Sequence, residues 1–221
     1  MQQSRTAALA LADLEFLADL ELESIQEPPS PPLAYVGGWS INTPDMNTAI
    51  AAIIKRAGAR EAFSVFTLNL DHLVKLQRDE RFRQAYSNAD IVTADGAPVA
   101  WLARMQDSRI VRATGSDMLL PLLDAAADAR QPVFLFGSTD DVLTKAADEI
   151  SNHTDGLLKI AGMRSPSPAF DPEGPEADRA IETIRRSGAR ICIVALGAPK
   201  QEIFAERARA KGLACGMVCA G

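Results

Sequence analysis

Short apolar runs alternate with longer segments of helical spacing along most of this chain, and this alternation strongly constrains its fold. The runs are rich in Val, Ile, Phe and Cys, which is typical of strands buried on both faces of a sheet. Strands of this kind separated by helices form a parallel sheet that helices cover on both sides. The pattern predicts an α/β, Rossmann-like, mostly parallel sheet with strands at 62–68, 89–94, 132–137, 157–162, 189–197 and 214–221.

The segments between the strands carry recognisable helix signals. Residues 71–88 have the spacing of one helix, and Pro98 suits the first turn of the next. Ser116 is expected to cap a further helix, whose first turns Pro121 would make irregular.

The start of the chain differs from the rest. Residues 6–24 have the pattern of an amphipathic, acidic helix, and the proline-rich segment 27–32 is expected to act as a stiff linker. Acidic residues interrupt the apolar stretch, so it lacks the continuous core of a secretory signal. We expect an N-terminal helix and linker at 1–34 and one folded domain at 35–221.

Charge and hydropathy narrow the classes of partner. The formal net charge of -6 argues against a surface that neutralises nucleic-acid phosphates. No segment approaches the roughly 20 apolar residues needed to span a bilayer, so a cytoplasmic location is expected. Cys192, Cys215 and Cys219 lie in apolar runs and are expected to be buried free thiols of a reducing compartment.

Polar and glycine residues collect where the predicted strands end, which is the edge at which parallel sheets bind ligands. Each has an ordinary local explanation, since Asp-Gly is a common turn and Thr-Gly-Ser a common capping loop. Together, a carboxylate, an amide, an arginine and open helix N-termini suit an anionic leaving group and a hydroxyl to be deprotonated. The candidates are Thr67, Asn69, Asp95, Gly96, Arg112, Thr114, Gly115, Ser116, Gly137, Ser138, Gly197, Lys200 and Gln201.

Common nucleotide and metal motifs are missing from these strand ends. No G-x-G-x-x-G follows a strand and no G-x-x-x-x-G-K-[ST] occurs, so Phe136–Asp141 is the nearest match to a phosphate loop. There is no Asp-x-Asp pair, and the sequence shows no partner for His72 or His153. Neither a metal site nor a cofactor is therefore expected.

Several blocks of the sequence together resemble a known family, the WecG/TagA/CpsF glycosyltransferases. The blocks are "TLNLDHLVKLQRDERFRQAYSNADIVTADGAPVAWLARM", "RATGSDMLLPLL", "PVFLFGS" and "IVALGAPKQEIFAERAR". The resemblance implies inverting transfer of an N-acetylmannosamine-type sugar from UDP to a lipid-linked acceptor such as undecaprenyl-diphospho-N-acetylglucosamine. It also implies an enzyme that needs no metal ion and acts at the cytoplasmic face of the membrane. Such an enzyme would contribute to the synthesis of teichoic acid, exopolysaccharide or another cell-surface polymer.

Matched position by position, the resemblance assigns roles to individual residues. The family's proposed base matches Asp95, and its paired Thr and Asn match Thr67 and Asn69. Its Gln in the Pro-Lys-Gln-Glu block matches Gln201, and Arg112 matches the Arg before Thr-Gly. Residues 35–221 would then be the glycosyltransferase core domain.

The sequence differs from the family pattern after the last predicted strand. Family members continue into an Arg- and aromatic-rich segment that helps to close the site and to meet the membrane, whereas this sequence ends at Gly221. A truncated member with slow transfer is therefore expected. A catalytically silent UDP-sugar-binding domain is the alternative, and the absent glycine fingerprint disfavours a dinucleotide oxidoreductase.

Overall fold

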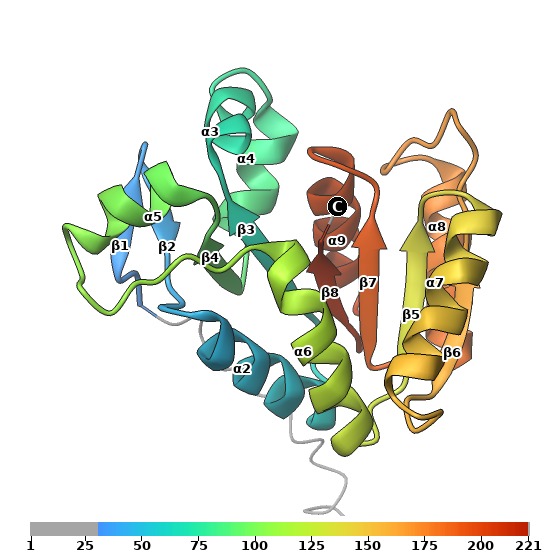
Figure 1. The fold of residues 1–221 in the computed structure, drawn as a ribbon. Coiled ribbons are helices and arrows are strands. Elements are labelled where there is room, and N and C mark those ends of the chain that lie inside the picture. Colours follow the sequence, from blue (N-terminus) through green and yellow to red (C-terminus); the bar gives the residue numbers. More distant parts are fainter. Residues whose placement is uncertain (1–30, 221) are drawn as a thin grey trace, which may run out of the picture.

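A six-stranded, all-parallel sheet forms the centre of the structure, a computed structural model that describes residues 31–220 (Figure 1). The strand order is β4-β3-β8-β7-β5-β6, so the last strand in sequence lies inside the sheet. The predicted Rossmann-like α/β fold is confirmed. The strands are β3 (Phe63–Leu68), β4 (Ile91–Ala94), β5 (Val133–Gly137), β6 (Ile160–Arg164), β7 (Ile191–Ala195) and β8 (Gly216–Cys219).

Helices cover both faces of this sheet (Figure 1). One face packs against α2 (Met46–Gly58), α6 (Gly115–Asp128) and α7 (Asp140–His153). The other face packs against α3 (Leu70–Leu76), α4 (Glu80–Ser87), α8 (Pro175–Ser187) and α9 (Lys200–Ala210). Helix α5 (Ala97–Arg104) lies beside the small antiparallel hairpin of β1 (Ala34–Val36) and β2 (Trp39–Ile41).

Alternate residues of each strand enter opposite apolar cores. In β3, Phe63 and Val65 belong to the core under α2 and α6, whereas Phe66 and Leu68 belong to the core under α4 and α9. Successive side chains of a strand point to opposite faces, so both sets must be apolar when both faces are covered. This double burial is why the strands appear as continuous apolar runs in the sequence.

Two helix predictions are wrong in detail. The segment at 71–88 forms two helices because Asp79 caps α4, its carboxylate accepting a hydrogen bond from the Phe82 amide at 2.9 Å. Helix α6 is capped by Thr114 instead of Ser116. Pro121 lies inside α6 without ending it.

The sequence pattern did not predict the hairpin of β1 and β2 or helix α2, which precede β3. The predicted helix at 6–24 lies outside the described residues, as does most of the linker, so the division at residue 34 stays a prediction.

Both histidines have partners, contrary to the sequence prediction. His72 Nδ1 lies 2.6 Å from the Tyr86 hydroxyl, and His153 Nε2 lies 2.8 Å from the Asp124 carboxylate. Each partner belongs to a different helix, so only the folded chain brings them together. The three cysteines are buried free thiols, as predicted.

Candidate active site

The chain diverges at two points along the carboxyl edge of the sheet. After β3 it enters α3 on one face, whereas after the neighbouring β4 it passes through α5 to α6 on the other face. After β7 it enters α9, whereas after the neighbouring β5 it enters α7 on the opposite face. Ligands of parallel α/β sheets bind at such switch points, and a pocket lies at each of these two.

The first pocket, called here the Asp95 pocket, has a volume of about 280 Å³. It brings together the ends of β3, β4 and β8 and the start of α6. All of its lining residues except Ala220 were singled out from the sequence. They are Thr67, Asn69, Asp95, Thr114, Gly115, Ser116 and Ala220.

Asp95 directly follows β4, and its backbone N–H donates to Leu68 O at 2.8 Å, which extends the ladder with β3. The Thr67 hydroxyl donates to Asp95 Oδ2 at 3.3 Å, and the Asn69 side chain also hydrogen-bonds this carboxylate. Burial raises the pKa of Asp95, while the hydrogen bonds from Asn69 and Thr67 and the charge of Arg112 oppose the rise. A positioned carboxylate with raised basicity can accept a proton from a hydroxyl.

Neighbouring residues position this carboxylate in the wall of the pocket. Asn69 Oδ1 caps α3 by accepting from the His72 amide at 2.9 Å, which leaves the Asn69 amide nitrogen to donate to Asp95. Gly96 has a φ of 79°, a left-handed conformation that glycine adopts without strain. The chain therefore turns sharply after Asp95 and enters α5, which carries a proline in its first turn as predicted.

The N-terminus of α6 also lines the Asp95 pocket. Thr114 Oγ1 accepts from the Asp117 amide at 3.0 Å, whereas the amides of Gly115 and Ser116 have no acceptor within residues 31–220. Open amides and the helix dipole make this wall suitable for an anion. Arg112, on the approach to the helix, forms an exposed ion pair with Asp117 at 3.0 Å.

The second pocket, called here the Ser138 pocket, has a volume of about 450 Å³ and lies at the ends of β5, β6 and β7. Its walls combine four hydroxyl side chains with apolar groups and the Lys200 side chain, which has no ion-pair partner in the described part of the chain. The lining residues are Ser138, Thr139, Ser165, Pro166, Ser167, Pro168, Phe170, Ala195, Leu196 and Lys200.

The remaining candidates line neither edge pocket. A Cβ on Gly137 would lie 2.2 Å from Ala195 O, so this glycine is required where β5 and β7 approach closely. Gly197 lies in the turn before α9. Gln201 is only 2% exposed, and its side chain donates to Glu202 Oε1 at 2.9 Å.

Sequence reasoning missed several residues around these sites. Ser165 and Ser167 belong to a proline-rich loop after β6, in which alternating Ser and Pro offer hydroxyls on a stiff chain. Glu202, the neighbour of Gln201, is completely buried, and nothing in the local pattern separates it from an ordinary exposed helix residue.

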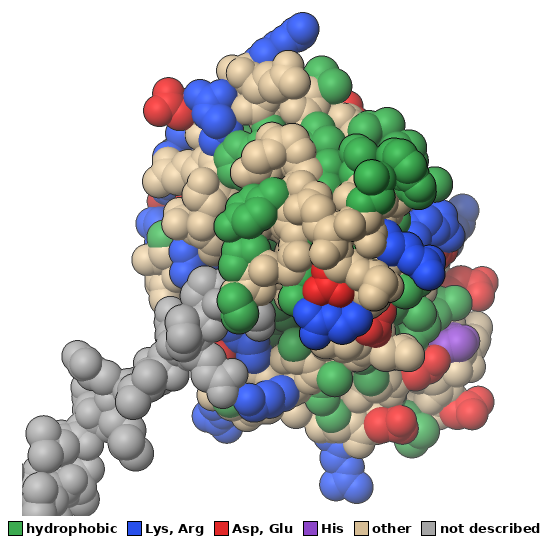
Figure 2. Space-filling view, turned by 90° about the vertical axis from the view of Figure 1, so that its left-hand side faces the viewer, with side chains coloured by type: hydrophobic (Ala, Val, Ile, Leu, Met, Phe, Trp, Pro, Cys, Tyr) green, Lys and Arg blue, Asp and Glu red, His purple; other side chains and the backbone are tan. Residues whose placement is uncertain are grey.

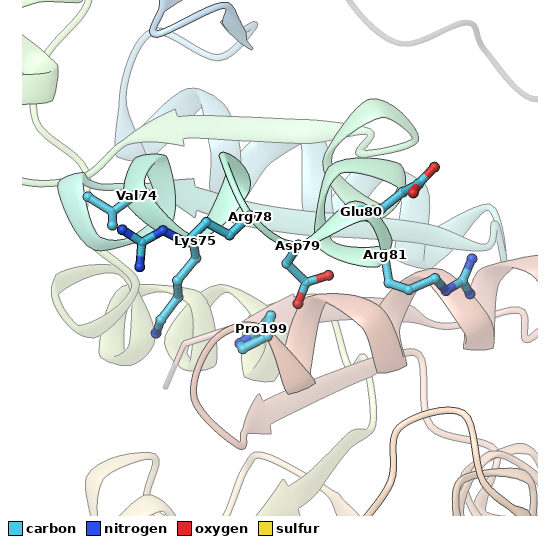
Figure 3. Close-up of a pocket in the computed structure, with 7 residues that line it drawn as sticks. All are labelled: Val74, Lys75, Arg78, Asp79, Glu80, Arg81 and Pro199. Atoms are coloured by element: carbon cyan, nitrogen blue, oxygen red, sulfur yellow. The ribbon is translucent and has the colours of Figure 1, made fainter.

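A third pocket of about 430 Å³ lies between the α3–α4 junction and the turn before α9 (Figure 3). Lys75 and Asp79 point toward Pro199, whereas Glu80 and Arg81 point away from it. Lys75 Nζ donates to Ala198 O at 2.9 Å, which ties α3 to the turn before α9. Its lining carries both basic and acidic side chains, namely Lys75, Arg78 and Arg81 with Asp79 and Glu80.

Two features are absent from residues 31–220, a cluster of metal ligands and a helix that could span a membrane. No group of three or more His, Cys, Asp or Glu side chains there could hold a metal ion. Within the same residues, every helix is too short or too polar to cross a bilayer.

A parallel sheet with pockets at its switch points defines an α/β protein that binds its ligand at the carboxyl edge. The sequence profile of the glycosyl transferase WecG/TagA/CpsF family matches residues 34–221. The chain belongs to this family, as the resemblance in the sequence predicted, and its class is therefore that of a glycosyltransferase.

Proposed function

We propose that this protein transfers an N-acetylmannosamine-type sugar from a UDP donor to a lipid-diphosphate-linked N-acetylglucosamine acceptor, with inversion, in the synthesis of teichoic acid or another cell-surface polysaccharide. The observation that carries the proposal is the Asp95 carboxylate, which accepts hydrogen bonds from Thr67 and Asn69 and lines the same pocket as the open amides of α6. Family membership supports the reaction class.

The reaction is a single displacement in which Asp95 is the catalytic base. Asp95 accepts the proton of the acceptor hydroxyl as that oxygen attacks the anomeric carbon of the donor sugar. The bond from the anomeric carbon to the diphosphate oxygen breaks, and UDP leaves with the bonding electron pair. One base is sufficient for such an inverting step, which agrees with one carboxylate among the lining residues of the pocket.

The two edge pockets support a placement for the donor. β3 and β5 are separated by β8 and β7, three strand spacings or about 14 Å, which an extended nucleotide-sugar can span. The sugar and diphosphate lie beside Gly115 and Ser116, and the nucleoside reaches toward the Ser138 pocket. The α6 amides stabilise the negative charge that develops on the leaving diphosphate, and Lys200 contributes a positive charge from the Ser138 pocket.

Because the acceptor is linked to a lipid, the protein must associate peripherally with the cytoplasmic face of the membrane to reach it. Helix α5 follows Asp95 and carries Trp101, whose exposed fraction is 64%. Met105, just after the helix, has an exposed fraction of 69%. Figure 2 shows hydrophobic side chains on the side of the molecule that carries α5 and the hairpin. An exposed Trp beside a site is suited to the membrane interface, which supports this route for the acceptor.

The Asp95→Asn variant tests the assignment of the base. Turnover is expected to fall about 100-fold or more with little change in donor affinity, because the amide cannot accept the proton. Transfer is measured with a panel of UDP-sugars on a lipid-diphospho-N-acetylglucosamine analogue, and donor affinity by calorimetry. Asp128→Asn, which makes the same change at an exposed position, is the control.

Near-normal turnover in a folded Asp95→Asn protein would contradict the base assignment. Donor binding by the wild-type protein without transfer to any acceptor of the panel would instead favour the silent UDP-sugar-binding domain.

A further inference from the structure

A buried polar cluster lies behind the Asp95 pocket, on the opposite face of β3. Its members are His72 on α3, Tyr86 on α4 and Glu202 on α9, whose helices pack on that face. All three residues are buried, with exposed fractions of 4%, 4% and 0%. Three buried titratable side chains therefore lie together, and none of them takes part directly in the proposed reaction.

The contacts of this cluster lead to the catalytic base. Glu202 Oε1 lies 3.9 Å from His72 Nε2, and His72 Nδ1 lies 2.6 Å from the Tyr86 hydroxyl. The Tyr86 hydroxyl donates to the backbone carbonyl of Thr67 at 3.3 Å. On the other side of the strand, the Thr67 hydroxyl donates to Asp95 at 3.3 Å.

We propose that Glu202, His72 and Tyr86 are positioning residues that hold the end of β3, and through Thr67 the carboxylate of Asp95, in the geometry that the base requires. The inference rests on the proposed function for the role of Asp95 as a base. The contacts that carry it are independent of that role.

Thr67 connects the buried cluster on one face of β3 with Asp95 on the other. Thr67 lies near the carboxyl end of β3 and pairs with Thr93 of β4, two residues before Asp95. Its carbonyl contacts the cluster, whereas its hydroxyl contacts Asp95. A small rotation of this residue therefore moves the Asp95 hydrogen bond directly, and a misplaced base lowers turnover steeply.

The cluster is uncharged between about pH 4 and pH 7, although Glu202 Oε1 and His72 Nε2 lie only 3.9 Å apart. Burial lowers the pKa of His72 to about 4 and raises the pKa of Glu202 to about 7, so each group favours its uncharged form. Glu202 Oε2 is buried without a hydrogen-bond partner within residues 31–220. Ionisation would place a negative charge on a carboxylate with only one of its two oxygens hydrogen-bonded by a side chain, which is costly in the interior.

The groups around Glu202 offset only part of that cost: the Gln201 side chain donates to Oε1 and Lys75 adds a positive charge, but burial has the larger effect and raises the pKa. The charged or titratable side chains that face it are His72, Lys75 and Asp71 from α3, Tyr86 from α4 and Cys219 from β8. Lys75 is already paired with Asp71 at 2.6 Å. Ionised Glu202 is therefore expected to disturb the cluster, and the positioning of Asp95 with it.

The Tyr86→Phe variant tests the network because it removes only the hydroxyl and keeps the ring, which packs on Phe66 and Phe82. We expect kcat for sugar transfer to fall about fivefold to tenfold with KM unchanged, because the contacts of the hydroxyl with Thr67 O and His72 Nδ1 are both lost. In an Asp95→Asn background the same change is expected to have no further effect, because the base to be positioned is gone. An equal loss in both backgrounds overturns the proposal.

A second readout does not depend on activity. The pKa of the Asp95 carboxyl, followed by NMR titration of its side-chain carbon, is expected to rise in Tyr86→Phe, because the Thr67 hydrogen bond that lowers it is loosened. An unchanged Asp95 pKa in the folded variant overturns the proposal even where transfer is not detected. Absent transfer by the wild-type protein, with a raised Asp95 pKa in the variant, contradicts only the proposed function.

Glu202→Gln provides a variant that keeps shape and neutrality. The ratio of wild-type to variant kcat is expected to fall several-fold between about pH 6 and pH 8, since only the wild-type side chain ionises there. Glu206→Gln, one turn further along α9, is the matched control and should show a constant ratio. A constant ratio for Glu202→Gln as well would show that Glu202 has no part in positioning.

Discussion

The Glu202→Gln substitution is also expected to change how the stability of the protein depends on pH. The Glu202 carboxyl has the ordinary glutamate pKa of 4.5 in the unfolded chain and a pKa of about 7 in the folded protein. The folded state therefore holds this proton more tightly, and its contribution to stability is present below pH 4.5 and lost as pH rises toward 7. At 1.36 kcal/mol for each pH unit, the loss is about 3 kcal/mol.

His72 has the opposite dependence. Its pKa falls from 6.5 in the unfolded chain to about 4 in the folded protein, so stability is lost as pH falls below 6.5. Between pH 4.5 and 6.5 the two contributions have opposite slopes and nearly cancel in the wild-type protein. Glu202→Gln removes one of them, and its unfolding free energy should then rise by about 1.4 kcal/mol per pH unit relative to wild type.

Urea unfolding at four pH values between 4.5 and 7.5 measures this difference. Trp39, whose ring lies 5.9 Å from Tyr86, is a fluorescent reporter close to the cluster. His72→Gln should produce the opposite change, a stability that falls with pH relative to wild type, and Glu206→Gln should remain parallel to wild type. Parallel curves for wild type, Glu202→Gln and His72→Gln would refute the assignment of a neutral Glu202–His72 pair.

Other predictions follow from the site and its supports. Gly137→Ala should destabilise the protein by about 2–4 kcal/mol in urea unfolding, because its Cβ would meet Ala195 O at 2.2 Å. Thr114→Ala should cost about 1 kcal/mol in the same assay through loss of the α6 cap, whereas Ser116→Ala should cost little. Lys200→Met should weaken UDP binding about tenfold by calorimetry, since it removes a cation of the Ser138 pocket. Chelator should leave transfer unchanged, because protein groups are proposed to stabilise the diphosphate; a rate restored only by added Mg²⁺ or Mn²⁺ would contradict that view.

The fold class and the family could be predicted from the amino-acid sequence alone. Continuous apolar runs between helical segments allow little else than a parallel sheet covered on both faces, because a strand with one solvated face would alternate polar and apolar residues. The candidate residues were also accessible, because the carboxyl end of a strand is a local feature of the sequence. Thr67, Asn69, Asp95 and the start of α6 do lie together in one pocket.

Only the tertiary structure shows which strand ends are neighbours. β8, the last strand, lies between β3 and β7, so the residues that follow β4 and those that follow β5 are placed at separate pockets. The buried state of Glu202 and the partner of His72 depend on how α3, α4 and α9 pack together. Strand order and helix packing depend on contacts between segments far apart in the chain. Local periodicity in the sequence does not predict these contacts.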